Sequence, residues 1–175
     1  MKKFKLTSEF IVDISGVKLF RIKALIEFGN VKAGDLGGYI EKEENLSHMG
    51  DAWVSDDARI SGNARVSGDA QVFGDAQVFG NARVFGNARV SGDTQVFGDA
   101  RVSGDKDYAY AHGFGSCNRT TTFFRLKDGD VGVRCGCFYG TLAQFRDKVC
   151  ETHGETKKAQ EYLMLADLME IRFKN

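Results

Sequence analysis

An uninterrupted six-residue repeat between residues 48 and 107 constrains this chain more than any other feature of its sequence. An aliphatic residue recurs at every sixth position, and a small residue stands two positions before each. The aliphatic positions are Val54, Ile60, Val66, Val72, Val78, Val84, Val90, Val96 and Val102, and the small ones are Ala52, Ala58, Ala64, Ala70, Ala76, Ala82, Ala88, Thr94 and Ala100. Side chains alternate between the two faces of a strand, so both members of each pair point inward together. Each hexad therefore predicts one short strand.

A glycine lies two positions after the aliphatic residue of each hexad from Gly62 to Gly104, and an Asp or Asn follows it. Both residue types tolerate positive φ, so the pair is typical of a turn. Three strands and three corners make a triangular coil. The hexads therefore predict a parallel β-helix whose coils stack about 4.8 Å apart. Gly 21 with Pro 0 agrees with a chain that turns at a fixed glycine position.

The repeat resembles that of the bacterial transferase hexapeptide-repeat proteins. The resemblance implies a left-handed parallel β-helix and a homotrimer, but this fold carries many functions. Three further segments resemble uncharacterised hexapeptide-repeat proteins of phages and prophages, namely residues 34–41 (GDLGGYIE), 45–47 (NLS) and 136–142 (GCFYGTL). The second resemblance implies a phage origin.

Residues 1–47 are predicted to form an N-terminal hairpin and cap. Two strands, at 10–14 and 17–22, flank the turn Ser15-Gly16. Leu36, Ile40 and Leu46 are expected to add an irregular first coil. A cap is needed because a terminal coil exposes unpaired strand edges and an open core.

After the repeats, residues 108–118 read as a connection without period, and residues 119–175 as a small ββαα unit. Strands at 120–126 and 131–134 surround a turn. A capping box, Thr141 to Gln144, begins a helix that ends near Gly154. A second amphipathic helix carries Ala159, Tyr162, Leu163, Ala166 and Met169. The predicted fold is thus mainly β.

Charge and hydropathy limit the partners and the compartment. Lys+Arg 24 against Asp+Glu 24 gives a formal net charge of zero, which argues against bulk binding of nucleic acid or acidic membranes. The basic N-terminus lacks the apolar core of a secretory signal, and no segment is expected to span a bilayer. We therefore expect a cytoplasmic protein, in the host bacterial cytoplasm if it is phage-encoded.

The outward positions of the hexads form columns along three faces. One column reads Arg65, Arg83, Arg101, while the other two contain glutamine at several positions. Two interpretations of the arginine column stay open. Its members pair, across coils or subunits, with corner carboxylates such as Asp69, Asp75, Asp93 and Asp99. Alternatively, they line a crevice between subunits and hold the phosphates of a ligand while Phe79, Phe85 or Phe97 stacks on a base.

Four phenylalanines, Phe73, Phe79, Phe85 and Phe97, are also predicted to point outward. Regular rows of exposed phenylalanine usually mark an interface. We therefore interpret them as candidates for the contacts of a homotrimer.

Cysteine and histidine spacing does not favour a metal site. Cys135 and Cys137 lie on one side of a strand, with Cys117, Cys150, His112 and His153 as further conceivable ligands, but the chain lacks a CxxC pair. No metal, cofactor or catalytic residue is predicted.

Three functions remain in view. An acyltransferase is implied by the hexapeptide resemblance, but the repeats contain no histidine, and His48 and His112 lie outside them. A virion or assembly component is a second possibility, although a few coils are short for a fibre. We favour the third, a non-catalytic binding scaffold that captures a host defence protein or sequesters a nucleotide signal.

Overall fold

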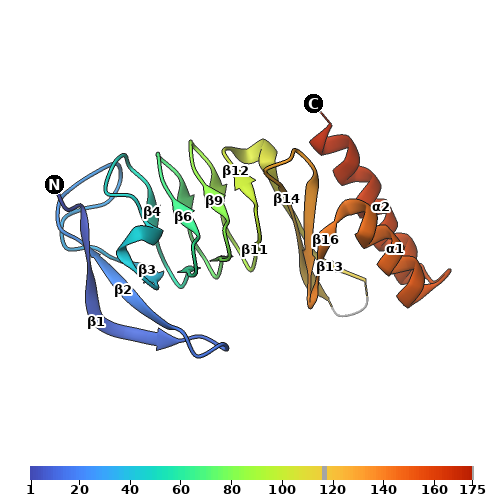
Figure 1. The fold of residues 1–175 in the computed structure, drawn as a ribbon, viewed down its shortest axis with the longest axis horizontal. Helices are drawn as coiled ribbons and strands as arrows, with labels where there is room; N and C mark the ends of the chain where they lie inside the picture. The colour runs from blue at the N-terminus through green and yellow to red at the C-terminus, as the bar shows by residue number, and fades with distance from the viewer. Residues whose placement is uncertain (116–117, 175) are drawn as a thin grey trace.

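A computed structural model describes residues 1–115 and 118–174. It is an elongated β-solenoid with a strand-rich N-terminal region at one end and a sheet with two helices at the other (Figure 1). The two chain termini lie at opposite ends of the molecule. The mainly β architecture predicted from the repeats is confirmed.

Nine two-residue strands build the solenoid: β4 (Trp53–Val54), β5 (Arg59–Ile60), β6 (Arg65–Val66), β7 (Gln71–Val72), β8 (Gln77–Val78), β9 (Arg83–Val84), β10 (Arg89–Val90), β11 (Gln95–Val96) and β12 (Arg101–Val102). They form three parallel sheets, in the orders β4-β7-β10, β6-β9-β12 and β5-β8-β11. Each strand pairs in register with the third strand after it, as Val54 does with Val72. Three hexads therefore complete one coil.

The core of the solenoid is the predicted column of aliphatic and small residues. The aliphatic residue of every hexad is fully buried, and Thr94 occupies the small position of its hexad without any exposure. Its hydroxyl donates to the carbonyl of Ser91 at 2.9 Å, so this polar position in the column is satisfied. Between Gly62 and Gly98 the corner glycines have φ of 63° to 73°, a region that other residues adopt only at a steric cost.

The N-terminal region extends one solenoid sheet. Strands β1 (Phe4–Val12) and β2 (Lys18–Ala24) form the predicted hairpin, and β3 (Leu36–Ile40) joins β2 to β5. Ile40 pairs with Ile60 and Leu46 with Val66, and both are buried, so they form the expected irregular coil. The same expectation was wrong for Leu36, which is 52% exposed, because only the later residues of β3 reach the solenoid core.

A buried lysine closes the N-terminal end of the solenoid. The Lys3 side chain is only 2% exposed, and its ammonium donates to the carbonyls of Ala52 at 2.8 Å and Gly50 at 3.1 Å. The same ammonium lies 4.6 Å from the centre of the Phe28 ring. Lys3 thus satisfies first-coil carbonyls that have no earlier coil to bond.

The C-terminal unit contains four strands rather than the predicted two. After the short 3-10 helix η2 (Asp105–Asp107), strands β13 (Tyr108–Phe114), β14 (Arg119–Arg125), β15 (Val131–Cys135) and β16 (Phe138–Thr141) form one antiparallel sheet in chain order. Residues 108–114 were therefore wrongly assigned to a connection. Their Ala, His and Gly content is weak as a strand signal, and pairing with β14 imposes the conformation.

Two helices cover this sheet, α1 (Leu142–His153) and α2 (Lys157–Phe173). The predicted capping box is confirmed, because Thr141 Oγ1 accepts from the Gln144 amide and Gln144 Oε1 accepts from the Thr141 amide. Tyr108 and Phe124 from the sheet complete the solenoid core and close its second end. Within the described residues, no helix has both the length and the apolarity needed to cross a membrane.

Because Lys3 closes the first coil, we expect Lys3→Met to destabilise the fold by about 1 to 3 kcal/mol. Methionine keeps an apolar stem but leaves two buried carbonyls without a donor. Urea unfolding followed by circular dichroism measures the change. Lys5→Met is the matched control, since Lys5 is exposed. Equal urea midpoints for Lys3→Met and Lys5→Met would contradict this role of Lys3.

The same lysine predicts a dependence of stability on pH. Burial lowers the pKa of Lys3 from 10.5 to about 8. Between these values the unfolded chain binds more protons at Lys3 than the folded chain does, so this residue's contribution to stability rises with pH. We expect the unfolding free energy of the wild type to increase relative to that of Lys3→Met between pH 8 and 10.5. If the difference in unfolding free energy between the wild type and Lys3→Met stays constant or shrinks over this pH range, the lowered pKa of Lys3 is refuted.

Candidate anion-binding groove

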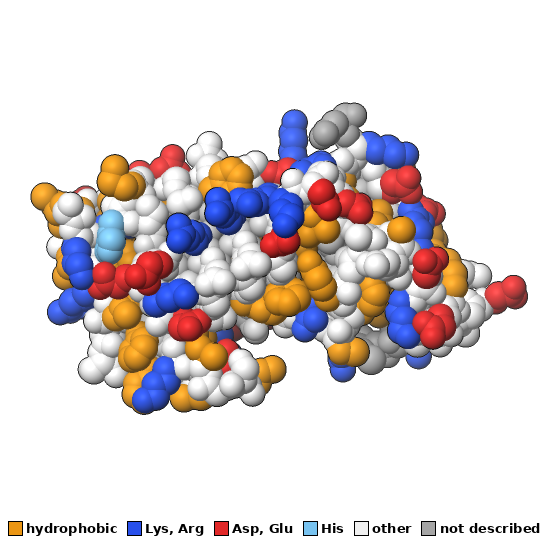
Figure 2. Space-filling model, viewed as in Figure 1, with side chains coloured by type: hydrophobic (Ala, Val, Ile, Leu, Met, Phe, Trp, Pro, Cys, Tyr) orange, Lys and Arg blue, Asp and Glu red, His pale blue; other side chains and the backbone are white. Residues whose placement is uncertain are grey.

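Three arginines stand in one row along a face of the solenoid. They are the first residues of β6, β9 and β12, and Arg83 pairs in register with both Arg65 and Arg101. The valine that follows each arginine is fully buried, so strand alternation turns the arginine outward. Arg65 and Arg83 are exposed, and Arg101 is half-buried. Cationic side chains gather in a line on this face in Figure 2.

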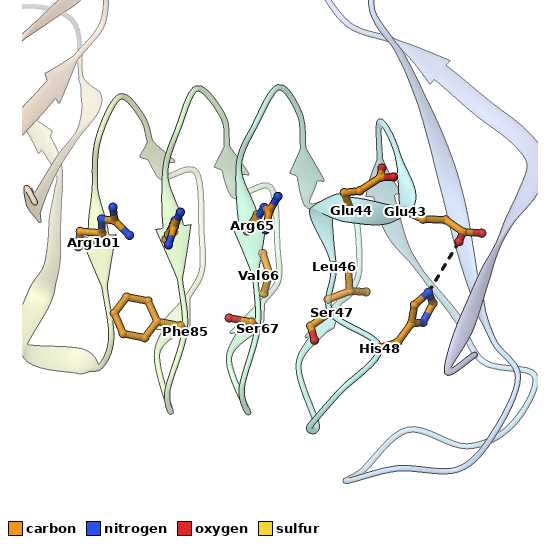
Figure 3. Close-up of a pocket in the computed structure, with 11 residues that line it drawn as sticks. Glu43, Glu44, Leu46, Ser47, His48, Arg65, Val66, Ser67, Phe85 and Arg101 are labelled. Atoms are coloured by element: carbon orange, nitrogen blue, oxygen red, sulfur yellow. Dashed lines mark ion pairs between the residues drawn. The ribbon is translucent and has the colours of Figure 1, made fainter. Parts of the chain in front are cut away.

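A groove of about 640 Å³ lies beside the row. The three arginines form one side, and Phe85 lies near Arg101, as Figure 3 shows. The groove ends at the first coil and the short helix η1 (Glu43–Asn45). Its other lining residues are Glu43, Glu44, Leu46, Ser47, His48, Val66 and Ser67.

None of the three arginines forms an ion pair with a carboxylate among residues 1–115 and 118–174. Salt bridges between the coils of one chain are therefore not formed by the row, and pairing across subunits stays a prediction. Asp99, one of the carboxylates considered for it, pairs with Lys127 at 2.9 Å, and Arg101 adds only a weaker attraction. Asp69 accepts a hydrogen bond from the amide of Asp51 instead.

A ladder of polar side chains runs along the other side of the arginine row. Asn63 donates to Asn81 and Asn81 donates to Asp99, each at 3.3 Å. The hydrogen bond from Lys127 holds the pKa of the Asp99 carboxyl below its ordinary value. This ladder and the row line a second depression of about 590 Å³, to which Lys42 and Lys127 add further positive charge. The arginines are thus accessible from two sides.

His48 lies at the N-terminal end of the groove as a packed side chain. Its Nδ1 accepts from the Lys3 amide at 3.2 Å, and its ring stacks on Phe4 with 4.3 Å between centroids. Its Nε2 is buried, has no hydrogen-bond partner among the described residues and lies 3.8 Å from Glu43. Neither nitrogen is presented to the groove, so this geometry does not suit a general base.

Within one chain, only Phe85 of the three phenylalanines proposed for base stacking lies at the arginines, and stacking by Phe79 or Phe97 between subunits stays a prediction. Phe85 lines the groove and is 37% exposed. Phe79 and Phe97 follow strands of a neighbouring sheet, and their rings lie 4.5 Å apart. Phe97 also contacts Tyr139 at 4.7 Å, so this pair helps to seat the C-terminal sheet. Phe73 is half-buried at another corner, and its role in a homotrimer stays a prediction.

The acidic and histidine residues at the groove end were not assigned to a site from the sequence. The sequence signal that could have marked these residues is a break in the regular spacing of the coils. Leu46 pairs with Val66, 20 positions later, whereas Trp53 pairs with Gln71, 18 positions later. Two additional residues therefore widen this corner and carry His48 to the groove.

The cysteines form no recognisable metal centre. Cys135 is half-buried, with its thiol 3.2 Å from the hydroxyl of Thr121, while Cys137 and Cys150 are exposed. Within the part of the chain that the structure describes, no three His, Cys, Asp or Glu side chains are placed to hold a metal ion. Cys117, which the sequence considered as a ligand, lies outside the described residues.

The fold and the groove define a β-solenoid repeat protein with a cationic face. The repeats are similar to the YdcK β-solenoid repeat, whose family model matches residues 58–74, 76–92 and 82–96. No curated protein matches the chain. The comparison therefore supports the scaffold and assigns no ligand to it.

The arginines of the row repel one another, because like charges lie on neighbouring strands. We therefore expect Arg83→Gln to stabilise the fold by about 0.5 kcal/mol at low ionic strength. The gain should shrink in about 1 M salt, where the Debye length is about 3 Å. Urea unfolding at both salt concentrations measures it. Arg89→Gln is the control, since Arg89 is exposed and pairs with Gln71. A destabilised Arg83→Gln would indicate that the arginine has a structural partner.

Proposed function

We propose that this chain is a non-catalytic binding scaffold whose arginine row captures a phosphorylated small molecule. The observation that supports this most is the row itself, because Arg65, Arg83 and Arg101 stand in register without a carboxylate partner among the described residues. Stacked cations of this kind are unfavourable until an anion neutralises them. The formal net charge of zero agrees with a local site rather than a cationic surface.

The dimensions of the row favour a ligand with more than one phosphate. Neighbouring strands of a sheet lie about 4.8 Å apart, so the row from Arg65 to Arg101 spans about 10 Å. Guanidinium groups bind phosphate oxygens through paired hydrogen bonds. Phe85 offers an exposed aromatic ring beside them on which a base can stack. A nucleotide satisfies both requirements.

The resemblance to phage and prophage proteins suggests a setting for such binding. In a host bacterial cytoplasm, a trimeric scaffold of this kind would sequester a nucleotide signal used in host defence. Binding of a defence protein to the same face is the alternative form of the proposal. The acidic residue Glu44, exposed and without an ion pair in the described structure, would then receive a basic side chain of that protein.

Isothermal titration calorimetry with a panel of linear and cyclic nucleotides tests the proposal. We expect micromolar or tighter binding of at least one member, and a loss of tenfold or more on Arg83→Ala or Arg101→Ala, since a charged hydrogen bond contributes about 1.5 to 3 kcal/mol. Phe85→Ala should weaken nucleotides but not inorganic pyrophosphate. The control is Arg89→Ala, an exposed arginine of another sheet.

An absence of heat with every nucleotide, together with a stable protein complex from host lysate on size-exclusion chromatography, would exclude the nucleotide and favour the protein partner. If the wild type and Arg83→Ala bind the nucleotide or the protein partner with equal affinity, the arginine row is not the binding site.

A further inference from the structure

A second cationic pocket lies where the solenoid meets the C-terminal sheet. It has a volume of about 280 Å³ and shares no lining residue with the arginine groove. Asp93 and Gln95 come from the solenoid, while His112, Arg119, Thr120 and Arg134 come from strands β13 to β15. Two arginines and a histidine therefore converge on a space smaller than most sites for whole cofactors.

Arg134 is held in place on two sides. Its Nε donates to Gln95 Oε1 at 2.9 Å, and its guanidinium carbon lies 5.9 Å from the centre of the Phe97 ring. A guanidinium has five N–H donors, and the terminal ones have no partner among the described residues. Because Arg134 is held through Nε, the terminal N–H donors of its guanidinium stay free to bind a ligand. Such a preorganised arginine loses little conformational entropy when it binds an oxyanion.

Arg119 provides the second guanidinium. It lines the pocket together with Gly136 and has no ion pair or side-chain hydrogen bond in the described part of the chain. A Cβ at residue 136 would fall 2.6 Å from Arg119 Nη1, so the end of this guanidinium lies beside Gly136 at the pocket wall. Arg119 is exposed, so its guanidinium can adjust to a ligand.

His112 and Asp93 complete the pocket. His112 Nδ1 lies 2.9 Å from Thr120 Oγ1, which orients the imidazole. Asp93 is exposed at a solenoid corner and forms no ion pair with either arginine, since none lies within 4.0 Å of its carboxylate. With one anchored arginine, one exposed arginine and one carboxylate, the pocket suits an anionic group that carries a hydroxyl or amino donor nearby.

We propose that this pocket is a second binding site, for the phosphate or carboxylate group of a small hydroxylated or aminated metabolite. Arg119 and Arg134 bind the oxyanion, and Asp93 accepts a hydrogen bond from the neighbouring donor. Because the lining residues come from both the solenoid and the C-terminal unit, the ligand joins the two and stabilises the junction.

Calorimetric titration with inorganic phosphate and, separately, with acetate tests the site in an Arg83→Ala background, which removes the central arginine of the other groove. We expect one remaining site for at least one anion, together with a rise in melting temperature. Adding Arg119→Ala should weaken it tenfold or more. Arg134→Lys keeps the charge but not the fork, so a smaller loss is expected. Adding Arg89→Ala instead is the control, with no expected change.

Tighter binding of phosphate would assign a phosphorylated ligand, and tighter binding of acetate a carboxylate. The proposal is overturned if neither anion binds in the Arg83→Ala background, or if Arg119→Ala and Arg134→Lys both leave the affinity unchanged. Arg119 is exposed and makes no side-chain bond in the described structure, so its removal should leave the unfolding midpoint without ligand unaltered. This control separates loss of the site from loss of the fold.

Discussion

In-register stacking of identical hexads is the constraint on which the rest of this structure depends. When parallel strands stack in register, each position lies over its equivalent in the next coil. Val66, Val84 and Val102 therefore form a core column, and the arginines that precede them must form a row on the outer surface. The same hydrogen bonds that build the scaffold thus align three like charges.

Stacking also leaves each end of the solenoid open, and the chain closes the two ends by different means. At the N-terminal end, Lys3 donates to the unpaired carbonyls and Phe4 stacks on His48. At the C-terminal end, Tyr108 and Phe124 pack into the core, and burial raises the pKa of the Tyr108 hydroxyl to about 12. The first cap has a consequence for the groove, because it fixes His48 and Glu43 at the end of the arginine row.

The parts of the molecule that repeat could be predicted from the sequence, and the parts that depend on a single tertiary contact could not. Periodicity alone predicted the strands, corners and core, because each hexad makes the same contacts as the next. Strand β13 was missed because its conformation comes from pairing with β14 rather than from its own residues. The column of outward arginines was predictable, and the hexad count also places Phe79 and Phe97 on a different face from them. The contact of the Phe97 ring with Tyr139 was not predictable, because Tyr139 lies 42 residues after Phe97 in the chain.

The other two faces of the solenoid act as internal controls for the arginine row. Their equivalent columns read Trp53, Gln71, Arg89 and Arg59, Gln77, Gln95, so no second face stacks like charges on three successive coils. The hexad therefore does not require arginine at this position, since glutamine occupies it in strands of the same length and register. Gln71 donates to the carbonyl of Asp51, and Gln95 accepts from Arg134, so these neutral residues serve the scaffold directly. Arginine at all three positions of one face adds repulsion without a bond inside the described chain. The anion proposed for the row would convert that repulsion into attraction, because each guanidinium would then face an opposite charge.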